Sequence, residues 1–370
     1  MTDPLRAAQR VGPVFDHERL VAARELLGLT QAELASRADI TPSALSQIER
    51  GSSRPTAANL TRLAEELTVP VEGLARRPRP ATDLNPQFRH LRRTPQRERR
   101  KALRLVEATN AVSKVLASHV DLPSPMAFTR PIDPDAPIAD VQDEVEHAAL
   151  ATRHVLGASS DAPLDPHWIV ILERHGVVVV RDPETDKDID AYSAVVDDLP
   201  IVILDGGSQS VWDRDNFNLA HELGHLIMHR DAEHRPGTRT VESQAHRFAG
   251  AFLAPKEAIR PEIPRDLDWK SYLALKARWG VSMAALIRRA RDLDVIDDEK
   301  YARAMKQRSA YGWRTVEPGN ELRPQPTPTL LSKAADIARL SIDDIANRAG
   351  IPTAVAKRII GEGQRPAVVP

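Results

Sequence analysis

The sequence predicts a mainly α-helical protein with one small β-sheet. Three observations support this fold class. Apolar residues recur at helical spacing through residues 17–75, short strand-like runs lie between residues 176 and 205, and a long helical pattern follows at residues 210–230. A chain of 370 residues also exceeds one ordinary hydrophobic core, so we expect two or three domains.

The composition excludes several classes of protein. The chain has no cysteine, which excludes disulfides, thiolate nucleophiles and cysteine metal sites and leaves His, Asp and Glu as metal ligands. Its 51 Lys and Arg against 52 Asp and Glu exclude a uniformly basic nucleic-acid coat. No apolar run reaches the roughly 18–20 residues that cross a membrane, and the N-terminus lacks the apolar segment of a signal peptide. We therefore expect a cytoplasmic protein with no membrane partner.

Residues 17–75 predict four consecutive helices. The first ends at Gly28, and QAELASRA forms the second. The third begins at TPSALSQIERG, with Thr41 as N-cap and Pro42 in the first helical position, where a missing N–H costs nothing. AANLTRLAEELTV forms the fourth. Two short helices joined by a tight turn, with a small residue (Ala35) between them, form a helix-turn-helix motif.

The segments GLTQAELASRADITPSALSQIERGSSRP and LTRLAEEL resemble the XRE family of DNA-binding domains. The resemblance implies a five-helix, lambda-repressor-like domain over residues 14–76 that binds double-stranded operator DNA as a homodimer. Asp39 stands where the family usually has a turn glycine, and Asp tolerates the left-handed conformation. The alternative is a helical bundle that merely exposes Gln and Ser.

The third helix of such a motif enters the major groove by its N-terminal end. Ser43 and Gln47 lie four residues apart on one face, and Gln can bind adenine by two hydrogen bonds. Gln31 resembles the family's phosphate-contacting glutamine. The predicted DNA-binding residues are Gln31, Thr41, Pro42, Ser43, Gln47, Arg50 and Arg54.

Residues 77–137 predict a basic helical connector followed by a proline-rich linker. An Arg-rich start passes into an amphipathic helix within residues 85–120, and DLPSPMAFTRPIDPDAP follows at 121–137. We expect the arginines to add non-specific phosphate contacts, although a charge run is as often only a solvated face. A second proline-rich linker is expected at residues 317–328.

Residues 164–205 predict a helix, a glycine turn and three strands, two of them at 191–196 and 200–205. The long helix after them contains His221-Glu222-Leu223-Gly224-His225, an HExxH motif. Histidines four residues apart lie on one helical face, so two ring nitrogens can converge on one ion. Glu222 lies beside them and can take a proton from water that Zn²⁺ acidifies. Gly224 leaves room for a neighbouring element.

Tetrahedral zinc needs a third protein ligand. The predicted helix at residues 241–255 offers Glu242 and His246, one turn apart on the same face, and either could reach the ion. His229 extends the histidine stripe, and we expect it to support the site rather than to bind the ion. The alternative for the whole site is a zinc ion that only stabilises the fold.

The motif FNLAHELGHLIMH followed by ESQAHRFAGAFLAP resembles the ImmA/IrrE family of metallo-endopeptidases, which are gluzincins. This resemblance implies an α+β, zincin-like domain, which we assign to residues 138–316, and a ligand set of His221, His225 and Glu242. Glu222 is then the catalytic base, and His246 is expected to support the oxyanion or to serve packing. Nearly the whole chain is similar to XRE–ImmA/IrrE fusions.

A helical tail is expected at residues 329–363. LSIDDIANRAGIPTAVAKRII repeats the pattern of LTQAELASRADITPSALSQIE, with Lys357 and Arg358 at the positions of Ser46 and Gln47. A second helix-turn-helix-like unit and a helical cap on the metal domain are both consistent with this pattern.

These features favour a DNA-binding transcriptional regulator whose zinc peptidase controls repression. By resemblance, the family's peptidases cleave XRE-type repressors, so cleavage could be of this chain, its dimer partner or a partner repressor. A non-hydrolytic zinc-binding regulator, or an antitoxin that holds a toxin, is the main alternative. A zinc hydrolase that uses its helix-turn-helix only for dimerisation is the third.

Overall fold

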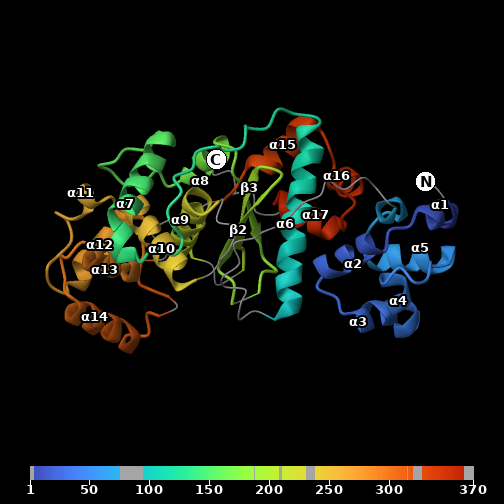
Figure 1. Ribbon diagram of the computed structural model, residues 1–370, viewed down its shortest axis with the longest axis horizontal. Helices are drawn as coiled ribbons and strands as arrows, with labels where there is room; N and C mark the ends of the chain where they lie inside the picture. Colours follow the sequence, from blue (N-terminus) through green and yellow to red (C-terminus); the bar gives the residue numbers. More distant parts are fainter. Residues whose placement is uncertain are drawn as a thin grey trace.

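The computed structural model describes residues 4–75, 95–186, 188–207, 211–230, 238–314, 316–319 and 327–361. Figure 1 shows the N-terminal helices at one end, a small sheet near the centre and the helices α7 and α9–α14 at the other end. The mainly helical fold with one three-stranded sheet confirms the predicted fold class. No helix in these described ranges has the length and apolar character needed to cross a membrane.

Five helices and two 3₁₀ turns form the N-terminal domain. They are α1 (Pro4–Val11), η1 (Gly12–Val14), α2 (His17–Leu26), α3 (Gln31–Arg37), α4 (Pro42–Glu49), α5 (Ala57–Glu66) and η2 (Val71–Leu74). The first of them, α1, has no counterpart in the sequence prediction. One leucine-rich core holds the domain together, with Leu20, Leu34, Leu45, Leu60 and Leu63 fully buried.

The turn between α3 and α4 follows the predicted local chemistry. Asp39 has φ +51°, so the aspartate adopts the left-handed conformation that the turn requires. The Thr41 hydroxyl accepts a hydrogen bond from the Ala44 N–H at 3.2 Å and caps α4, with Pro42 in its first turn. These local interactions fix where α4 begins and therefore which residues its N-terminal end presents.

The sheet has the strand order β1-β3-β2 and includes the three strands β1 (Val178–Asp182), β2 (Ala191–Val196) and β3 (Leu199–Asp205). Strand β3 pairs in parallel with β1 and antiparallel with β2. Asp197 and Asp198 join β2 to β3 with φ +49° and +65°. Two successive left-handed residues match the twist of a hairpin, and aspartate tolerates them better than most side chains.

One face of the sheet is covered by the helix that contains the HExxH motif and by the helices packed around it. Helix α9 (Trp212–Met228) packs on β2 and β3, and α10 (Arg239–Leu253) packs against α9 and α7 (Ile138–Val155). The remaining helices on this side are α8 (Trp168–Arg174), α11 (Lys256–Ile259), α12 (Trp269–Trp279), α13 (Met283–Asp292) and α14 (Asp298–Ala310). Their buried apolar side chains form one continuous core with the α9-facing side of the strands.

The other face of the sheet is covered by α6 (Gln96–Ala117) and the C-terminal helices (Figure 1). Leu105 and Val112 of α6 are buried in the same cluster as Val178 and Ile203 of the strands. Arg104 of α6 pairs with Glu25 of α2 at 2.9 Å. The helix assigned to the connector therefore lies between the sheet and the N-terminal domain. Residues 77–94 of that segment lie outside the described residues.

The proline-rich segment 121–137 has no regular secondary structure but is bound to the core on the α9 side of the sheet. The N–H groups of Arg130 and Ile132 donate to the carbonyls of Ile227 and Met228, at the C-terminal end of α9, at 2.9 and 3.2 Å. Gly176 has φ +77°, and a Cβ there would collide with the backbone of Ser124. Of the second proline-rich segment, residues 320–326 lie outside the described ranges.

The tail forms three helices, α15 (Leu330–Ala338), α16 (Ile342–Ala349) and α17 (Thr353–Ile360). The turn between α16 and α17 contains Gly350 at φ +71°. Helix α17 packs on β1 and α6, and Thr353 donates a backbone hydrogen bond to the Thr68 carbonyl at 3.2 Å. The tail thus contacts both the sheet and the N-terminal domain. Residues 362 and 363 of the predicted tail lie outside the described part of the chain.

Candidate metal centre

The close approach of α9 and α10 creates the site. Both helices bury one side in the core, and Gly224 faces the ring of Phe248. A Cβ at Gly224 would lie 2.9 Å from that ring, closer than packed carbon atoms sit. Glycine therefore allows α10 to lie directly against the face of α9 that carries the HExxH histidines.

Three side chains from these two helices converge. His221 Nε2 lies 3.1 Å from His225 Nε2 and 3.2 Å from Glu242 Oε2, and His225 Nε2 lies 3.6 Å from Glu242 Oε1. The three side chains are at most 6% exposed. Among the described residues, these three side chains form the group whose donor atoms could hold a metal ion, and we call them the convergent group.

A chain of hydrogen bonds fixes the orientation of His225. Gln244 of α10 donates its amide N–H groups to the carbonyls of Asp133 and Ala136 at 2.9 and 2.8 Å, so its Oε1 faces the ring of His229. His229 Nε2 must donate to this oxygen, at 2.7 Å. Burial lowers the pKa of His229, which keeps its ring neutral.

The neutral His229 ring then accepts a hydrogen bond at its other nitrogen. Nδ1 of His225 lies 3.2 Å from Nδ1 of His229, so His225 donates from this nitrogen. Its Nε2 is thereby left with a lone pair that faces His221 and Glu242. The sequence predicts that His229 supports the site rather than binding the ion, and the contact with His225 is the one through which it can do so.

Glu222 lies on the next position of α9 and points toward the sheet. Its Oε2 accepts a hydrogen bond from the hydroxyl of Ser193 on β2 at 2.6 Å. Burial raises the pKa of Glu222 to about 8, helped by the nearby negative charge of Glu242 and opposed by the Ser193 hydrogen bond. A carboxyl with this pKa can exchange a proton near neutral pH, and a nearby cation would lower the value.

His246 lies beside the convergent group rather than in it. Its ring meets the His221 ring edge-on, with centroids 4.8 Å apart, and lies 5.4 Å from the ring of Phe217. The two candidates for the third donor, Glu242 and His246, therefore take different places: Glu242 faces both histidines, and His246 stands on the outer side of His221.

The residues predicted to bind DNA lie together on the exposed side of α3, α4 and the loop after α4. All seven are exposed: Gln31, Thr41, Pro42, Ser43, Gln47, Arg50 and Arg54. Beneath them, Arg24 and Glu49 form a buried ion pair at 2.6 Å, and the Gln31 amide donates to Glu49 at 2.7 Å. The ion pair ties α2 to α4 and holds Gln31 at the start of α3.

Sequence reasoning missed two residues of the metal centre, Ser193 and Gln244. Ser193 lies on β2, 29 positions before Glu222. Neither a single serine in a strand nor a single glutamine in a helix has a sequence signal that names its partner. Gln244 could be noticed only because it shares a turn of α10 with Glu242, on a helix already assigned to the site.

Comparison with known families matches two parts of the chain. Residues 20–74 match the family described as helix-turn-helix, and residues 172–291 match the one described as IrrE N-terminal-like domain. The second match runs from the last residues of α8 into α13, and it contains the sheet and the three convergent residues His221, His225 and Glu242. No curated protein matches the chain. The chain is therefore a fusion of an XRE-type helix-turn-helix DNA-binding domain with an ImmA/IrrE-like domain of a peptidase family.

Proposed function

We propose that this DNA-binding regulator is a zinc-dependent endopeptidase that controls repression by cleaving its own chain or a partner repressor. The observation that carries the proposal is the convergence of His221, His225 and Glu242, with the carboxyl of Glu222 beside them. Three protein donors leave a fourth position for water or substrate, which is the arrangement of catalytic rather than structural zinc sites.

The spacing of the three donors fits zinc. Two ligands of a tetrahedral zinc ion, each about 2.05 Å from it, lie roughly 3.3 Å apart. The separations here are 3.1, 3.2 and 3.6 Å. Two imidazoles and one carboxylate are also a donor set that zinc accepts, and the hydrogen bond from His225 Nδ1 to His229 leaves Nε2 available as a ligand.

The chemistry is divided between the ion and the protein. Zinc, when bound, supplies Lewis acidity that acidifies water and polarises a peptide carbonyl. Glu222 takes the proton from the attacking water and returns it to the leaving nitrogen, while Ser193 holds the carboxyl in place. His246, on the outer side of His221, donates to the oxygen on which negative charge develops.

The DNA-binding part of the proposal rests on the exposed face of α4. Ser43 and Gln47 contact base edges in the major groove, and Gln31, Arg50 and Arg54 contact phosphates. Two copies bind a pseudo-palindromic operator as a homodimer. A cytoplasmic location belongs to the same proposal.

The test compares wild type with Glu222→Gln, which keeps the size of the side chain and an oxygen that can accept from Ser193. Glu144→Gln, on the exposed side of α7, is the matched control. Tagged Glu222→Gln chain serves as the substrate, and mass spectrometry follows its cleavage by zinc-loaded wild type. We expect cleavage by wild type and Glu144→Gln, none by Glu222→Gln, and equal zinc content in all three. Equal cleavage and equal operator release with Glu222→Gln would exclude peptidase control.

One observation favours a non-hydrolytic regulator or antitoxin as the second candidate. His221, His225, Glu222 and Glu242 are each 5% exposed or less, which also suits a metal ion that only holds the fold. Under this alternative, one zinc ion per chain stabilises the protein, and neither this chain nor a partner repressor is cleaved. Co-purification of a toxin with the Glu222→Gln chain would favour the antitoxin.

A further inference from the structure

A cavity of about 250 Å³ lies directly beside the metal centre. Phe217 and Asn218, which precede His221 by about one helical turn of α9, are in its wall, and so is His246 of α10. The ring of His246 meets the ring of His221 edge-on, with centroids 4.8 Å apart. None of the lining residues belongs to the convergent group. A group in the cavity therefore lies next to the reacting position and displaces no metal donor.

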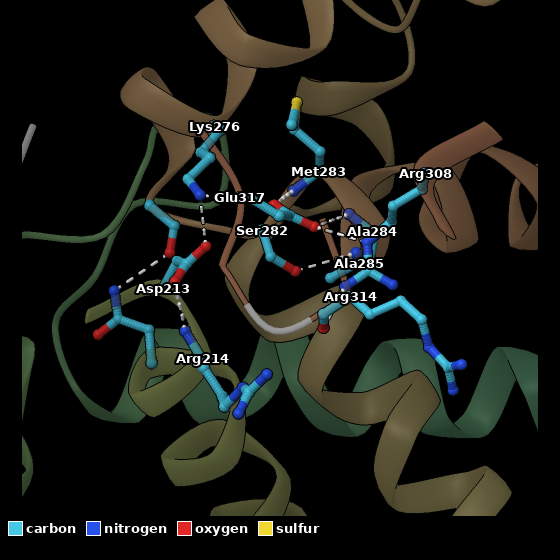
Figure 2. A network of polar contacts seen from close by, with 12 residues as sticks. Asp213, Arg214, Lys276, Ser282, Met283, Ala284, Ala285, Arg308, Arg314 and Glu317 are labelled. Atoms are coloured by element: carbon cyan, nitrogen blue, oxygen red, sulfur yellow. Dashed lines mark hydrogen bonds and ion pairs between the residues drawn. The ribbon is translucent and has the colours of Figure 1, made fainter. Parts of the chain in front are cut away.

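One wall of the cavity comes from beyond the family match. The match ends within α13, whereas the lining includes Tyr301 and Met305 of α14 and, after that helix, Glu317. The Glu317 carboxylate accepts the N–H groups of Met283 and Ala284 at 2.7 and 3.1 Å, which fixes its segment against the start of α13 (Figure 2). The shape of the cavity is therefore a property of this chain and not of the matched domain alone.

The carboxylates of the wall are paired with cations. Asp213 lies 2.8 Å from Nζ of the fully buried Lys276, and Glu317 lies 3.4 Å from the same nitrogen (Figure 2). Glu317 also lies 3.0 Å from Nε of Arg308, another residue of the wall. These two carboxylates and two cations balance one another, so this part of the wall has no excess of either charge.

The two other arginines of the wall also have carboxylate partners. Asp190 lies 3.9 Å from Arg214. Asp292 lies 4.0 Å from Nε of Arg288. The carboxylates and the Lys and Arg cations in and behind the wall are therefore equal in number. A charged group that entered the cavity would lose its hydration without meeting an uncompensated charge of opposite sign, which is unfavourable.

Apolar side chains from α9, α13 and α14 form much of the remaining wall. Four of them pack on the protein core with one side and are only partly buried: Phe217, Ala285, Tyr301 and Met305. The guanidinium of Arg291 lies 4.5 Å from the centre of the Tyr301 ring and steadies it. Apolar surface that the core leaves partly uncovered favours an apolar ligand, because covering it removes that surface from water.

The volume of the cavity suits one side chain rather than a whole small molecule. An apolar cavity of about 150 Å³ can hold a benzene molecule, whereas sites for whole small ligands measure roughly 300–1,000 Å³. At about 250 Å³, the cavity has room for a phenylalanine ring or a leucine side chain. Because the cavity adjoins His221 through His246, such a side chain would belong to a peptide whose neighbouring bond lies at the metal centre.

We propose that this cavity is a specificity pocket that receives one uncharged, apolar side chain of the polypeptide cleaved at the metal centre. Ala285 of α13 and Met305 of α14 limit its size. The inference rests on the proposed function and adds the class of substrate to it. The cleaved chain has a large apolar residue next to the cleaved bond, and a charged residue at that position is disfavoured.

The first experiment measures the pocket without any cleavage. Calorimetry on the full-length, zinc-loaded wild type compares hydroxamates, which bind zinc through the hydroxamate group and differ only in the attached side chain. The probes are acetohydroxamate, 3-phenylpropanohydroxamate and the monohydroxamate of succinate, which has a carboxylate. We expect the phenyl compound to bind about tenfold or more tightly than acetohydroxamate, the size expected from burying one apolar side chain. The carboxylate compound should bind no more tightly than acetohydroxamate.

Two variants alter the pocket. Ala285→Leu fills it and should reduce the affinity for the phenyl compound to nearly that for acetohydroxamate. Met305→Ala removes part of the apolar wall and should also narrow the difference. Ala302→Leu is the matched control, since Ala302 lies on α14, is exposed and does not line the cavity. Zinc content and thermal unfolding verify that every variant is folded.

Three results would overturn the pocket. They are equal binding of the phenyl compound and acetohydroxamate by wild type, a preference for the phenyl compound that survives unchanged in both Ala285→Leu and Met305→Ala, and tighter binding of the carboxylate compound than of the phenyl compound.

The second experiment identifies the substrate residue. The bond that zinc-loaded wild type cleaves in the tagged Glu222→Gln chain is mapped, and the residue on each side of it is changed to alanine. If the pocket holds the substrate, one of these residues is large and apolar, and its alanine variant is cleaved about tenfold or more slowly. The Ala285→Leu enzyme should no longer distinguish the two substrates, whereas Ala302→Leu should distinguish them as wild type does.

The two experiments separate failure of the pocket from failure of the proposed function. Cleavage at a bond with no apolar neighbour, or cleavage that is insensitive to that neighbour, would overturn the pocket and leave the peptidase standing. A preference for the phenyl compound without cleavage of the chain would contradict self-cleavage and leave the apolar pocket standing.

Discussion

Helices α3–α4 and α16–α17 have the same sequence pattern and opposite surroundings. In the N-terminal pair, Gln47 of α4 is exposed. In the C-terminal pair, the aligned residue Arg358 of α17 has its side chain only 10% exposed and binds Asp182 and Glu184 near the end of β1. One pattern therefore serves as a free surface in one place and as a packing surface in the other.

The interiors beneath the two helix pairs also differ, because one contains a buried ion pair and the other contains apolar residues. Arg24 and Glu49 form a buried ion pair in the N-terminal domain, and the aligned residues in the tail are the buried Ala335 and Ile360. Removal of either partner from a buried ion pair leaves an uncompensated charge, which is costly. We infer that the N-terminal pair is held in one geometry for binding, whereas the tail needs only to cover the sheet and α6.

The largest expected effect is at the buried ion pair. Glu49→Leu leaves the charge of Arg24 buried without its partner and should lower the free energy of unfolding of the N-terminal domain by about 3–5 kcal/mol. Hydrogen exchange of the α2 and α4 amides measures this loss. The double variant Arg24→Met, Glu49→Leu should recover most of it, and Ile360→Val in the tail should cost only about 0.5–1.5 kcal/mol. A small effect of Glu49→Leu would remove the difference between the two interiors.

The next effect is in the tail. Arg358→Met leaves the buried carboxyl of Asp182 without its cation, and we expect a loss of about 1–3 kcal/mol in the free energy of unfolding. Lys357→Met, on the exposed side of the same helix, should change it by less than about 0.5 kcal/mol. Urea unfolding of the full chain compares the two variants. If they are equally stable, α17 is not held by its charge contacts with β1.

Operator binding should depend on the exposed Gln47 of the N-terminal helix pair and not on the aligned Arg358 of the tail. Gln47→Ala should weaken binding to an operator selected from random DNA by about 1–3 kcal/mol, because a paired adenine loses its hydrogen bonds. Its stability should stay within about 0.5 kcal/mol of wild type. Arg358→Met should bind the operator as wild type does. Loss of operator binding in Arg358→Met would mean that the tail takes part in DNA recognition.

The smallest effect is a pH dependence. Burial raises the pKa of Asp182, and the charge of Arg358 opposes this shift. A carboxyl with a raised pKa in the folded state stabilises the fold fully below its ordinary pKa of 3.8 and loses that contribution as the pH rises through the folded-state value. Removal of Arg358 raises the pKa further. The stability difference between wild type and Arg358→Met should therefore grow from about pH 4 to pH 7, and parallel curves would contradict the assignment to Asp182.

Much of the metal centre was predictable because it depends on one helix. The spacing of His221 and His225 places both on one face of α9 whatever lies around it. The third donor was left open between Glu242 and His246, since the two share a face of α10. Only the way α10 crosses α9 at Gly224 turns Glu242 toward both histidines and leaves His246 beside His221.

The helices with weak local signals escaped prediction. Helix α1 is short and lies outside the helix-turn-helix pattern, and α7 begins in an acidic stretch after several prolines. Both are stabilised mainly by contacts with distant parts of the chain, α1 by α5 and α7 by α10. A pattern of nearby residues carries little information about such contacts.

The sequence by itself determined what depends on near neighbours: the caps of α3 and α4, the left-handed turn at Asp39, the strands and the spacing of the HExxH histidines. Tertiary structure decided what depends on distant partners: the hydrogen bond from Ser193 to Glu222, the Gln244–His229–His225 chain and the burial of α17 against β1. The reason is physical. Helix and turn geometry repeat with fixed local spacing, whereas the identity of a contact across the fold depends on how whole elements pack.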